Sequence, residues 1–298
     1  MPKVKNLIAE LPGAETIDLG ALRRGLADGS IELVCVLGPT ASGKTRYAVA
    51  LARELGGEII SADSRQVYRG MDIGTGKDLS EYGEIPYHLI DIADPGDGYN
   101  VFRFKEDFGR AFADIRSRGA VPILCGGTGL YINAVTSGYD FRTRKPLSQP
   151  ASVCPSPSSV IPAEAQRNGE GPNSEGISRP IPSGSTQNDS GRAPRTYFIG
   201  TLVTREERNA RIDARLDARL QEGMIDEIRG LLDRGAPASV LISYGLEYKY
   251  ITLYLQGELD YATMRERLAI AIHQFAKRQM TWFRGMERSG TVIHWTLP

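Results

Sequence analysis

The chain has 298 residues, of which 41% are hydrophobic and 24% are charged, as in an ordinary globular protein. Its 36 basic and 36 acidic residues cancel. This balance excludes an overall field that attracts a polyanion, so a nucleic-acid site has to be a local patch. The three cysteines are widely spaced, which argues against a disulfide framework or a cysteine zinc site. No apolar run reaches the roughly 18 residues of a membrane span, and no signal peptide is evident, so we expect a cytoplasmic protein.

Residues 1–31 form a polar lead-in, and the first regular unit follows it. The apolar run Leu33–Leu37 predicts a buried parallel strand. Residues 38–45 then match G-x-x-x-x-G-K-[ST] at every fixed position, and residues 46–55 predict a helix that Gly56 and Gly57 close. A strand, a glycine loop and a helix in this order form the context in which the pattern marks a phosphate site.

This loop is the strongest candidate binding site in the sequence. Its backbone N–H groups and the positive end of the helix dipole converge on an anion. Lys44 adds a charge, and the Thr45 hydroxyl is a candidate ligand for Mg²⁺. The expected ligand is a compound that carries a di- or triphosphate. The candidate phosphate-binding residues are Gly38, Pro39, Thr40, Ala41, Ser42, Gly43, Lys44 and Thr45.

A second strand, predicted for Glu58–Ala62, ends at Asp63. Because ligands of open parallel sheets bind at the carboxyl ends of the strands, the Asp63 carboxylate is expected to face the same crevice as the glycine loop. The alternative interpretation is that Asp63 is the N-cap of a following helix. A polar glycine-rich loop over residues 70–77 and a third strand over Tyr87–Ile92 come next.

Helical spacing predicts a helix over Val101–Arg118, and an apolar run predicts a buried strand over Val121–Cys125. The strand leads into a second glycine loop, Gly-Gly-Thr-Gly at 126–129, which alone is also typical of a tight strand-to-helix turn. Repeated strand–loop–helix units predict an α/β fold, a P-loop NTPase-like parallel sheet flanked by helices, with a helical C-terminal portion.

Residues 145–195 interrupt this pattern. They contain nine of the 17 prolines and ten serines, and such a segment cannot bury enough apolar surface to offset its ordering entropy. We therefore predict a disordered, low-complexity insertion. The predicted organisation is a lead-in at 1–31, the first part of the core at 32–144, the insertion at 145–195, and completion of the core with a helical region at 196–298.

Order resumes with a strand predicted over Tyr197–Val203, after which Thr204 is expected to cap a long helix. An arginine row along this helix has two interpretations, a solvated face or a clamp for phosphate oxygens. Residues 273–284 interleave basic and aromatic side chains, as in a nucleic-acid surface or in a helix whose aromatics are core and whose charges face solvent. The arginine row consists of Arg205, Arg208, Arg211, Arg215 and Arg219.

Five segments taken together resemble the tRNA dimethylallyltransferases, also called tRNA isopentenyltransferases. They are GPTASGKT (38–45), SADSRQVYRGMDIGTGK (61–77), HLID (88–91), GGTGLY (126–131) and AKRQMTWFR (276–284). The resemblance covers roughly residues 32–140 and 196–295. The segment 61–77 is the most specific, because it is not a general feature of nucleotide kinases.

The resemblance implies transfer of a dimethylallyl group from dimethylallyl diphosphate to the exocyclic amine of an adenosine next to the tRNA anticodon. It implies Asp63 as general base, Thr40 near the scissile oxygen, and Arg211 on the diphosphate. Mg²⁺ would be held at Thr45, and the target adenosine would be flipped out of its stack. The enzyme is expected to act as a monomer. The positions matching tRNA contacts are Asp63, Ser64, Arg65, Gln66 and Thr128.

The chain also departs from the family pattern. Between the Gly-Gly-Thr-Gly loop and the arginine helix, the family carries a folded helical insertion that grips the anticodon stem. Here the Pro- and Ser-rich residues 145–195 stand in its place. Two alternatives therefore stay open at this point, a P-loop kinase of a small metabolite or nucleotide and a catalytically silent paralogue.

Overall fold

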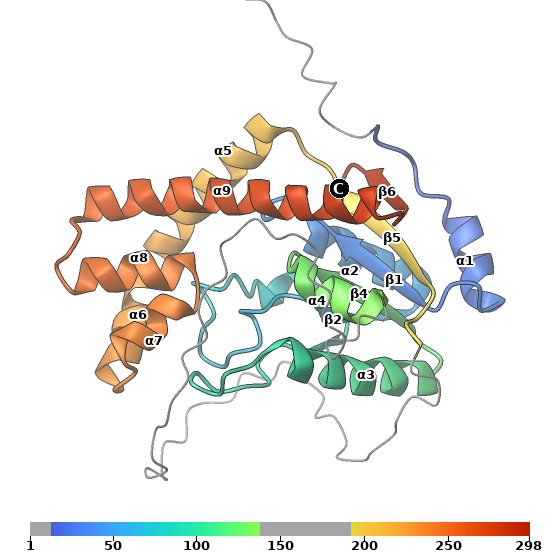
Figure 1. Ribbon diagram of the computed structural model, residues 1–298, viewed down its shortest axis with the longest axis horizontal. Coiled ribbons are helices and arrows are strands. Elements are labelled where there is room, and N and C mark those ends of the chain that lie inside the picture. Colours follow the sequence, from blue (N-terminus) through green and yellow to red (C-terminus); the bar gives the residue numbers. More distant parts are fainter. Residues whose placement is uncertain (1–12, 138–191) are drawn as a thin grey trace, which may run out of the picture.

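In the computed structural model, residues 13–137 and 192–298 are described, so all but the last four residues of the predicted insertion lie outside the described part. The described residues form a six-stranded sheet in the order β3-β2-β4-β1-β5-β6, with every neighbouring pair parallel (Figure 1). The strands are β1 Leu33–Leu37, β2 Gly57–Ser61, β3 Tyr87–His88, β4 Val121–Gly126, β5 Thr196–Thr201 and β6 Ile293–Thr296. The predicted fold class is confirmed.

Helices cover both faces of the sheet, which explains why its strands are apolar throughout. In β1, Leu33, Cys35 and Leu37 belong to one buried cluster, and Val34 and Val36 belong to the other. The second cluster includes the helices α1 and α2, and the first includes α3, α4 and the C-terminal helices. The helices of the N-terminal part are α1 Leu19–Ala27, α2 Lys44–Leu55, α3 Val101–Ser117 and α4 Gly129–Thr136.

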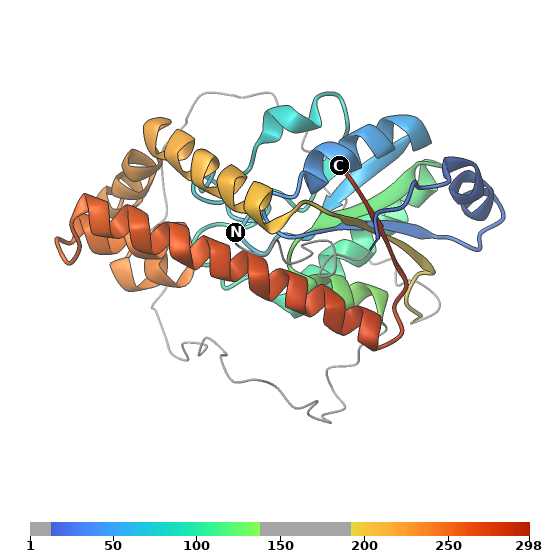
Figure 2. The ribbon, with the colours of Figure 1, turned by 90° about the horizontal axis from the view of Figure 1, so that it is seen from above.

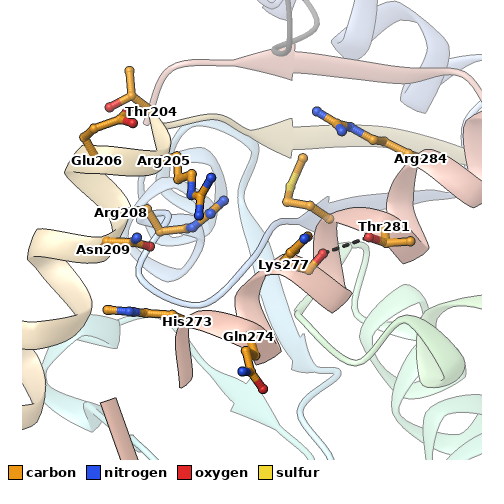
Figure 3. A pocket seen from close by; sticks show the side chains of 11 residues that line it. Thr204, Arg205, Glu206, Arg208, Asn209, His273, Gln274, Lys277, Thr281 and Arg284 are labelled. Atoms are coloured by element: carbon orange, nitrogen blue, oxygen red, sulfur yellow. Dashed lines mark hydrogen bonds between the residues drawn. The ribbon is translucent and has the colours of Figure 1, made fainter. Parts of the chain in front are cut away.

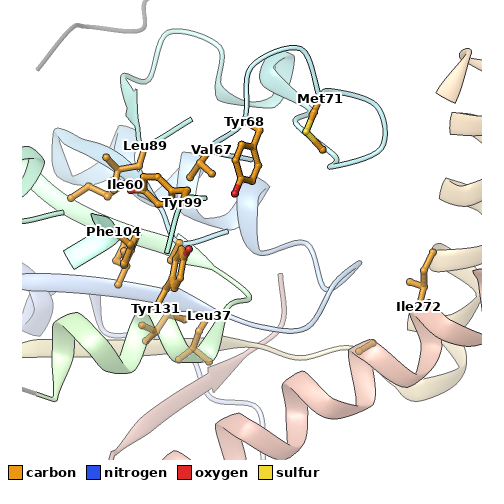
Figure 4. Packing of buried hydrophobic residues seen from close by; sticks show 14 of the residues in the cluster. Leu37, Ile60, Val67, Tyr68, Met71, Leu89, Tyr99, Phe104, Tyr131 and Ile272 are labelled. Carbon is orange, nitrogen blue, oxygen red and sulfur yellow. The ribbon is translucent and has the colours of Figure 1, made fainter. Parts of the chain in front are cut away.

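Aromatic side chains pack among the aliphatic ones in the larger core cluster (Figure 4). Phe104 of α3 stacks on Tyr131 of α4 with ring centroids 4.2 Å apart. Tyr99 is buried beside them and donates a hydrogen bond to Asp107 at 2.8 Å. The stack ties α3 to α4, and α4 begins in the second glycine loop, so this packing holds that loop against the sheet.

The C-terminal part is mainly helical, but it also supplies two strands of the sheet. The 28-residue α9 lies alongside α5, and both run past the strand ends that carry the glycine loops (Figure 2). β6 follows α9 and pairs with β5. This strand was not predicted from the sequence, because its four residues are too few to show a pattern. The helices are α5 Arg205–Gln221, α6 Met224–Asp233, α7 Ala238–Ser243, α8 Leu246–Leu255 and α9 Tyr261–Arg288.

The predicted third strand, Tyr87–Ile92, was wrong beyond its first two residues. Leu89 and Asp91 have positive φ angles of 63° and 55°, which a strand does not allow. The N–H groups of Asp91 and Ile92 donate to the carbonyls of Gln66 and Val67. This segment therefore leaves the sheet and supports the chain that follows Asp63. No helix in the described residues is long and apolar enough to cross a membrane.

Candidate functional site

The phosphate loop connects β1 to α2, as predicted. Ala41 and Gly43 have φ angles of 61° and 81°, so the loop curls back before the helix begins at Lys44. Gly38 leaves no room for a side chain, because a Cβ there would lie 2.3 Å from Thr201 Oγ1 and 2.6 Å from Ser42 Oγ. This close approach of backbone to side chain explains the first glycine of the motif.

A buried hydroxyl pair fastens this loop to the neighbouring strand. Ser42 Oγ lies 2.6 Å from Thr201 Oγ1 at the end of β5, and both residues are fully buried. The Thr201 hydroxyl is also 3.4 Å from the carbonyl of Leu37. Thr201 was not predicted as part of the site, because only the order of strands in the sheet brings β5 next to β1.

Lys44, the first residue of α2, is half-buried at the mouth of the loop. Desolvation lowers the pKa of its ammonium group, while Cys125 and the Asp63 carboxylate act in the opposite direction. Among the described residues, no carboxylate lies within ion-pair distance of Lys44. The loop therefore offers a partly desolvated positive charge that an incoming anion would stabilise.

Thr45 provides one hydroxyl, beside the carbonyl of Lys44 to which the Cys125 thiol donates at 3.8 Å. Within residues 13–137 and 192–298, no three His, Cys, Asp or Glu side chains are grouped as in a metal site built by protein alone. One hydroxyl fits Mg²⁺ as this ion is bound beside phosphates, where most of its ligands are phosphate oxygens and water.

Asp63 follows β2 and starts a tight turn instead of a helix, so its interpretation as a helix N-cap was wrong. Its Oδ1 accepts from the backbone N–H of Arg65 at 3.0 Å, an interaction that fixes the carboxylate within its own turn. No described group hydrogen-bonds Oδ2. That oxygen is therefore available to accept a proton at the edge of the sheet that carries the phosphate loop.

The second glycine loop meets the Asp63 turn. The N–H of Ser64 donates to the Thr128 hydroxyl at 3.2 Å, and the N–H of Thr128 donates to the carbonyl of Ala62 at 3.2 Å. Gln66 instead holds the loop over residues 70–77, because its Nε2 donates to the carbonyl of Gly76 at 3.1 Å. The structure therefore brings Ser64 and Thr128 together and turns Gln66 away from them.

Arg65 joins the turn to the C-terminal helices. Its Nη1 lies 2.8 Å from Glu247 Oε2 of α8, and its guanidinium lies over the Phe275 ring of α9, 5.5 Å from the centroid. Glu247 is 8% exposed. Arg65 was predicted only as a match to a tRNA contact. Its partners were not predicted, because they lie about 180 and 210 positions away along the chain and are adjacent only in the fold.

The arginine row of α5 divides into three parts. Arg215 and Arg219 form ion pairs with Asp78, so these two arginines have a structural role. Arg211 pairs with Glu207, and its Nη1 lies 4.0 Å from where a Cβ on Gly43 would be, beside the phosphate loop. Arg205 and Arg208 face a groove. The two interpretations of the row thus apply to different members of it.

The groove, of about 420 Å³, lies between the start of α5 and the middle of α9 (Figure 3). Arg205 and Arg208 enter it from α5, and Lys277 enters from α9. Arg208 Nε and Asn209 Oδ1 are buried without a hydrogen-bond partner. Desolvation and the nearby Arg205 lower the pKa of Arg208. The lining residues are Thr204, Arg205, Glu206, Arg208, Asn209, His273, Gln274, Lys277, Met280, Thr281 and Arg284.

Helix α9 combines the two interpretations given for residues 273–284. Phe283 and Met280 are buried in the core, as the structural interpretation predicts, while Lys277 and Arg278 are exposed. Trp282 is 42% exposed, and its indole packs on Gly129 of the second glycine loop, where a Cβ would lie 2.2 Å from Trp282 Cδ1. A charged and partly aromatic surface therefore adjoins the glycine loops.

Gln279 of α9 links the two glycine loops. Its Oε1 accepts from the N–H of Thr40 at 2.8 Å, and its Nε2 donates to the carbonyl of Gly127 at 2.9 Å. The side chain is largely buried, with 8% of the residue exposed. Gln279 lies in the family-like segment 276–284, but no role was predicted for it, because its partners lie 239 and 152 positions away in the chain.

Comparison with known proteins assigns this arrangement to a family. The family model described as IPP transferase matches residues 66–171 and 173–286, and the model described as isopentenyl transferase matches residues 31–84. The chain belongs to the IPP transferase family. The matches continue through the predicted insertion, beyond the two stretches, 32–140 and 196–295, over which the motifs were recognised.

Relatives of known name match nearly the whole chain. The chain is 50% identical over 283 residues to tRNA dimethylallyltransferase 1 of Porphyromonas gingivalis, covering 88% of this chain and 93% of that protein. It is 48% identical over 281 residues to tRNA dimethylallyltransferase 1 of Geotalea uraniireducens, covering 89% and 92%. Its structure is similar to the crystal structure of the full-length tRNA isopentenylpyrophosphate transferase of Bacillus halodurans, with a TM-score of 0.66, 29% identity and 88% of each chain covered.

Proposed function

We propose that this protein transfers a dimethylallyl group from dimethylallyl diphosphate to the exocyclic amine of the adenosine next to the anticodon in tRNA. Support comes from relatives that carry the name tRNA dimethylallyltransferase. The observation that carries the proposal is a carboxylate and a phosphate loop at one edge of the sheet. Gln279 hydrogen-bonds both the phosphate loop and the second glycine loop, and Thr128 of the second glycine loop contacts the turn that carries Asp63.

The donor side has the groups that a leaving diphosphate needs. As the C–O bond to the allylic carbon breaks, negative charge develops on the diphosphate, and fixed dipoles and cations stabilise it. The backbone amides of residue 41 and residues 43–45, together with Lys44 and Arg211, fill this role, with the Thr40 hydroxyl next to the scissile oxygen. Mg²⁺ held by Thr45 supplies further charge neutralisation when bound.

The acceptor side centres on Asp63. A bond forms between the amine nitrogen and the allylic carbon, and one amine proton moves to Asp63 Oδ2, the oxygen without a hydrogen bond among the described residues. Oδ1 stays on the N–H of Arg65 and keeps the carboxylate oriented. General-base assistance of this kind contributes about 10²–10⁴-fold to a rate.

The tRNA would bind beside these groups, with Asp63, Ser64, Arg65 and Thr128 around a flipped adenosine, while Gln66 supports the loop over residues 70–77 from behind. The exposed indole of Trp282 next to Gly129 is a surface on which a base can stack. Arg205, Arg208 and Lys277 in the groove supply the local positive patch that a protein of zero net charge needs for a nucleic acid.

The test is incorporation of label from dimethylallyl diphosphate into unmodified tRNA in the presence of Mg²⁺. We expect incorporation with the unchanged protein and a loss of about 10²–10⁴-fold in kcat with Asp63→Asn. Asp233→Asn, an exposed acid at the end of α6, is the matched control and should retain full activity. No label in tRNA, together with turnover of ATP on a small acceptor, would refute the proposal in favour of a kinase.

A further inference from the structure

The amide of Gln279 is a bridge of two hydrogen bonds between loops with different tasks. Thr40 belongs to the loop on the donor side, and Gly127 precedes Thr128 on the acceptor side. A single planar group therefore spans the two halves of the site at 2.8 Å and 2.9 Å. We propose that Gln279 is a positioning residue that sets the spacing between the diphosphate donor and the acceptor amine. This inference rests on the proposed function.

The surroundings of the amide leave it little freedom. A Cβ on Gly127 would lie 2.3 Å from Gln279 Nε2 and 3.3 Å from the carbonyl of Gly38. The absence of a side chain at Gly127 therefore lets the Gln279 amide and the phosphate loop approach its backbone. Met280, the next residue of α9, is 8% exposed, and Ala276, one turn before Gln279, is fully buried, so this part of the helix is anchored in the core. The amide is thus held on a rigid element, and its orientation follows from its two partners.

Each loop that Gln279 holds is connected to a reacting group. The Thr128 hydroxyl accepts from the N–H of Ser64, the residue after Asp63, at 3.2 Å. On the other side, the loop from Thr40 to Lys44 continues into α2 and carries the charge for the diphosphate. A shift of one loop relative to the other would change the distance from the amine to the allylic carbon. Misplacement by about 1 Å costs roughly 10²-fold in rate.

Only a neutral group with one acceptor and one donor satisfies both partners. A methionine side chain is about as long as that of glutamine but can form neither of the two hydrogen bonds. An ionised glutamate has two acceptor oxygens, so it would face the carbonyl of Gly127 without a proton and would repel the diphosphate. A protonated glutamate regains a donor, and a nearby anion raises the pKa of a carboxyl group.

The experiment measures single-turnover transfer to tRNA with both substrates saturating, together with KM for each. Gln279→Met should lower the single-turnover rate about 100-fold with less than about 3-fold change in either KM, at every pH. For Gln279→Glu, the rate relative to the unchanged protein should rise as the pH falls from about 8 to about 6. Gln221→Met, at the exposed end of α5, is the matched control and should behave like the unchanged protein.

A second measurement does not depend on turnover. The Thr40 N–H donates to Gln279 Oε1, so its hydrogen exchange should accelerate in Gln279→Met while amides in the strand β1 keep their protection. If Gln279→Met has the same saturating rate as the unchanged protein but a raised KM, Gln279 contributes to substrate binding and not to positioning, and the inference is overturned. Unchanged exchange at Thr40 would also overturn it. If the unchanged protein transfers no label, it is the proposed function that fails.

Discussion

Arg65 and Glu247 form an ion pair of 2.8 Å between the turn that carries Asp63 and the start of α8. Their side chains are 20% and 10% exposed, so the pair is largely removed from water. Burial lowers the pKa of Arg65, but the charges of Glu247 and Asp63 outweigh it and raise that pKa overall. The turn is thereby fixed to the C-terminal helices, and α8 takes part in shaping the site.

Replacing Glu247 should destabilise the protein and weaken tRNA binding. Glu247→Ala leaves the Arg65 guanidinium buried without its partner, which costs roughly 3 kcal/mol in free energy of unfolding. KM for tRNA should rise, while KM for dimethylallyl diphosphate should stay unchanged. Denaturant unfolding and steady-state kinetics measure both effects. Glu258→Gln, an exposed acid after α8, is the control, and an equal effect of both substitutions would contradict the prediction.

The pair of Ser42 and Thr201 should couple the phosphate loop to β5. Thr201→Val keeps the volume but leaves the buried Ser42 hydroxyl without a partner, which costs about 1–2 kcal/mol. KM for dimethylallyl diphosphate should rise at the same time. A double-mutant cycle with Ser42→Ala measures the coupling in denaturant. Strictly additive free energies would show that the two hydroxyls do not act together.

Lys44 should destabilise the protein in the absence of ligand. Desolvation lowers the pKa of its ammonium group, so the charged form is disfavoured in the folded state. Lys44→Met should therefore raise the melting temperature of the ligand-free protein at neutral pH by about 2–4 °C, while transfer activity is lost. The gain should disappear as the pH rises through the lowered pKa towards 10.5, where the unfolded state also loses the proton.

The control for this prediction is Lys249→Met, which removes an exposed ammonium that lies over the Tyr250 ring, 5.6 Å from its centroid. It should not raise the melting temperature. A lower melting temperature for Lys44→Met than for the unchanged protein would mean that the charge stabilises the empty loop, contrary to the prediction.

Glu58 should make stability depend on pH in the acid range. Burial alone raises its pKa, but hydrogen bonds from Arg118 and His88 outweigh this and lower the pKa below 4.5. The unfolded state then binds the proton more tightly, so the stabilisation is complete above pH 4.5 and is lost as the pH falls through the folded pKa. Glu58→Gln should cost on the order of 2 kcal/mol at pH 7.

Unfolding of both proteins from neutral pH down to about pH 3 tests this. The difference between Glu58→Gln and the unchanged protein should shrink below pH 4.5. A constant difference across this range would assign the loss to packing and not to the charge of Glu58.

The sequence by itself determined the elements that local pattern specifies. The apolar run Leu33–Leu37, the glycine motif and the helix after it predicted β1, the phosphate loop and α2, because a fixed order of residues forms this unit without distant partners. The family followed from the same short segments. Asp63 was placed correctly at the end of a strand, although the turn that follows it was not predicted, because an Asx-turn and a helix N-cap share the same residue types.

The tertiary structure decided which side chains act on these elements. Gln279, Thr201 and Glu247 reach the site from α9, β5 and α8, and their contacts span 239, 159 and 182 positions of the chain. The periodicity of apolar residues in the sequence cannot predict such a contact, because the contact depends on the order of strands in the sheet and on where α9 crosses them. The arginine row divides for the same reason. Asp78 lies next to Arg215 and Arg219, whereas Gly43 of the phosphate loop lies next to Arg211.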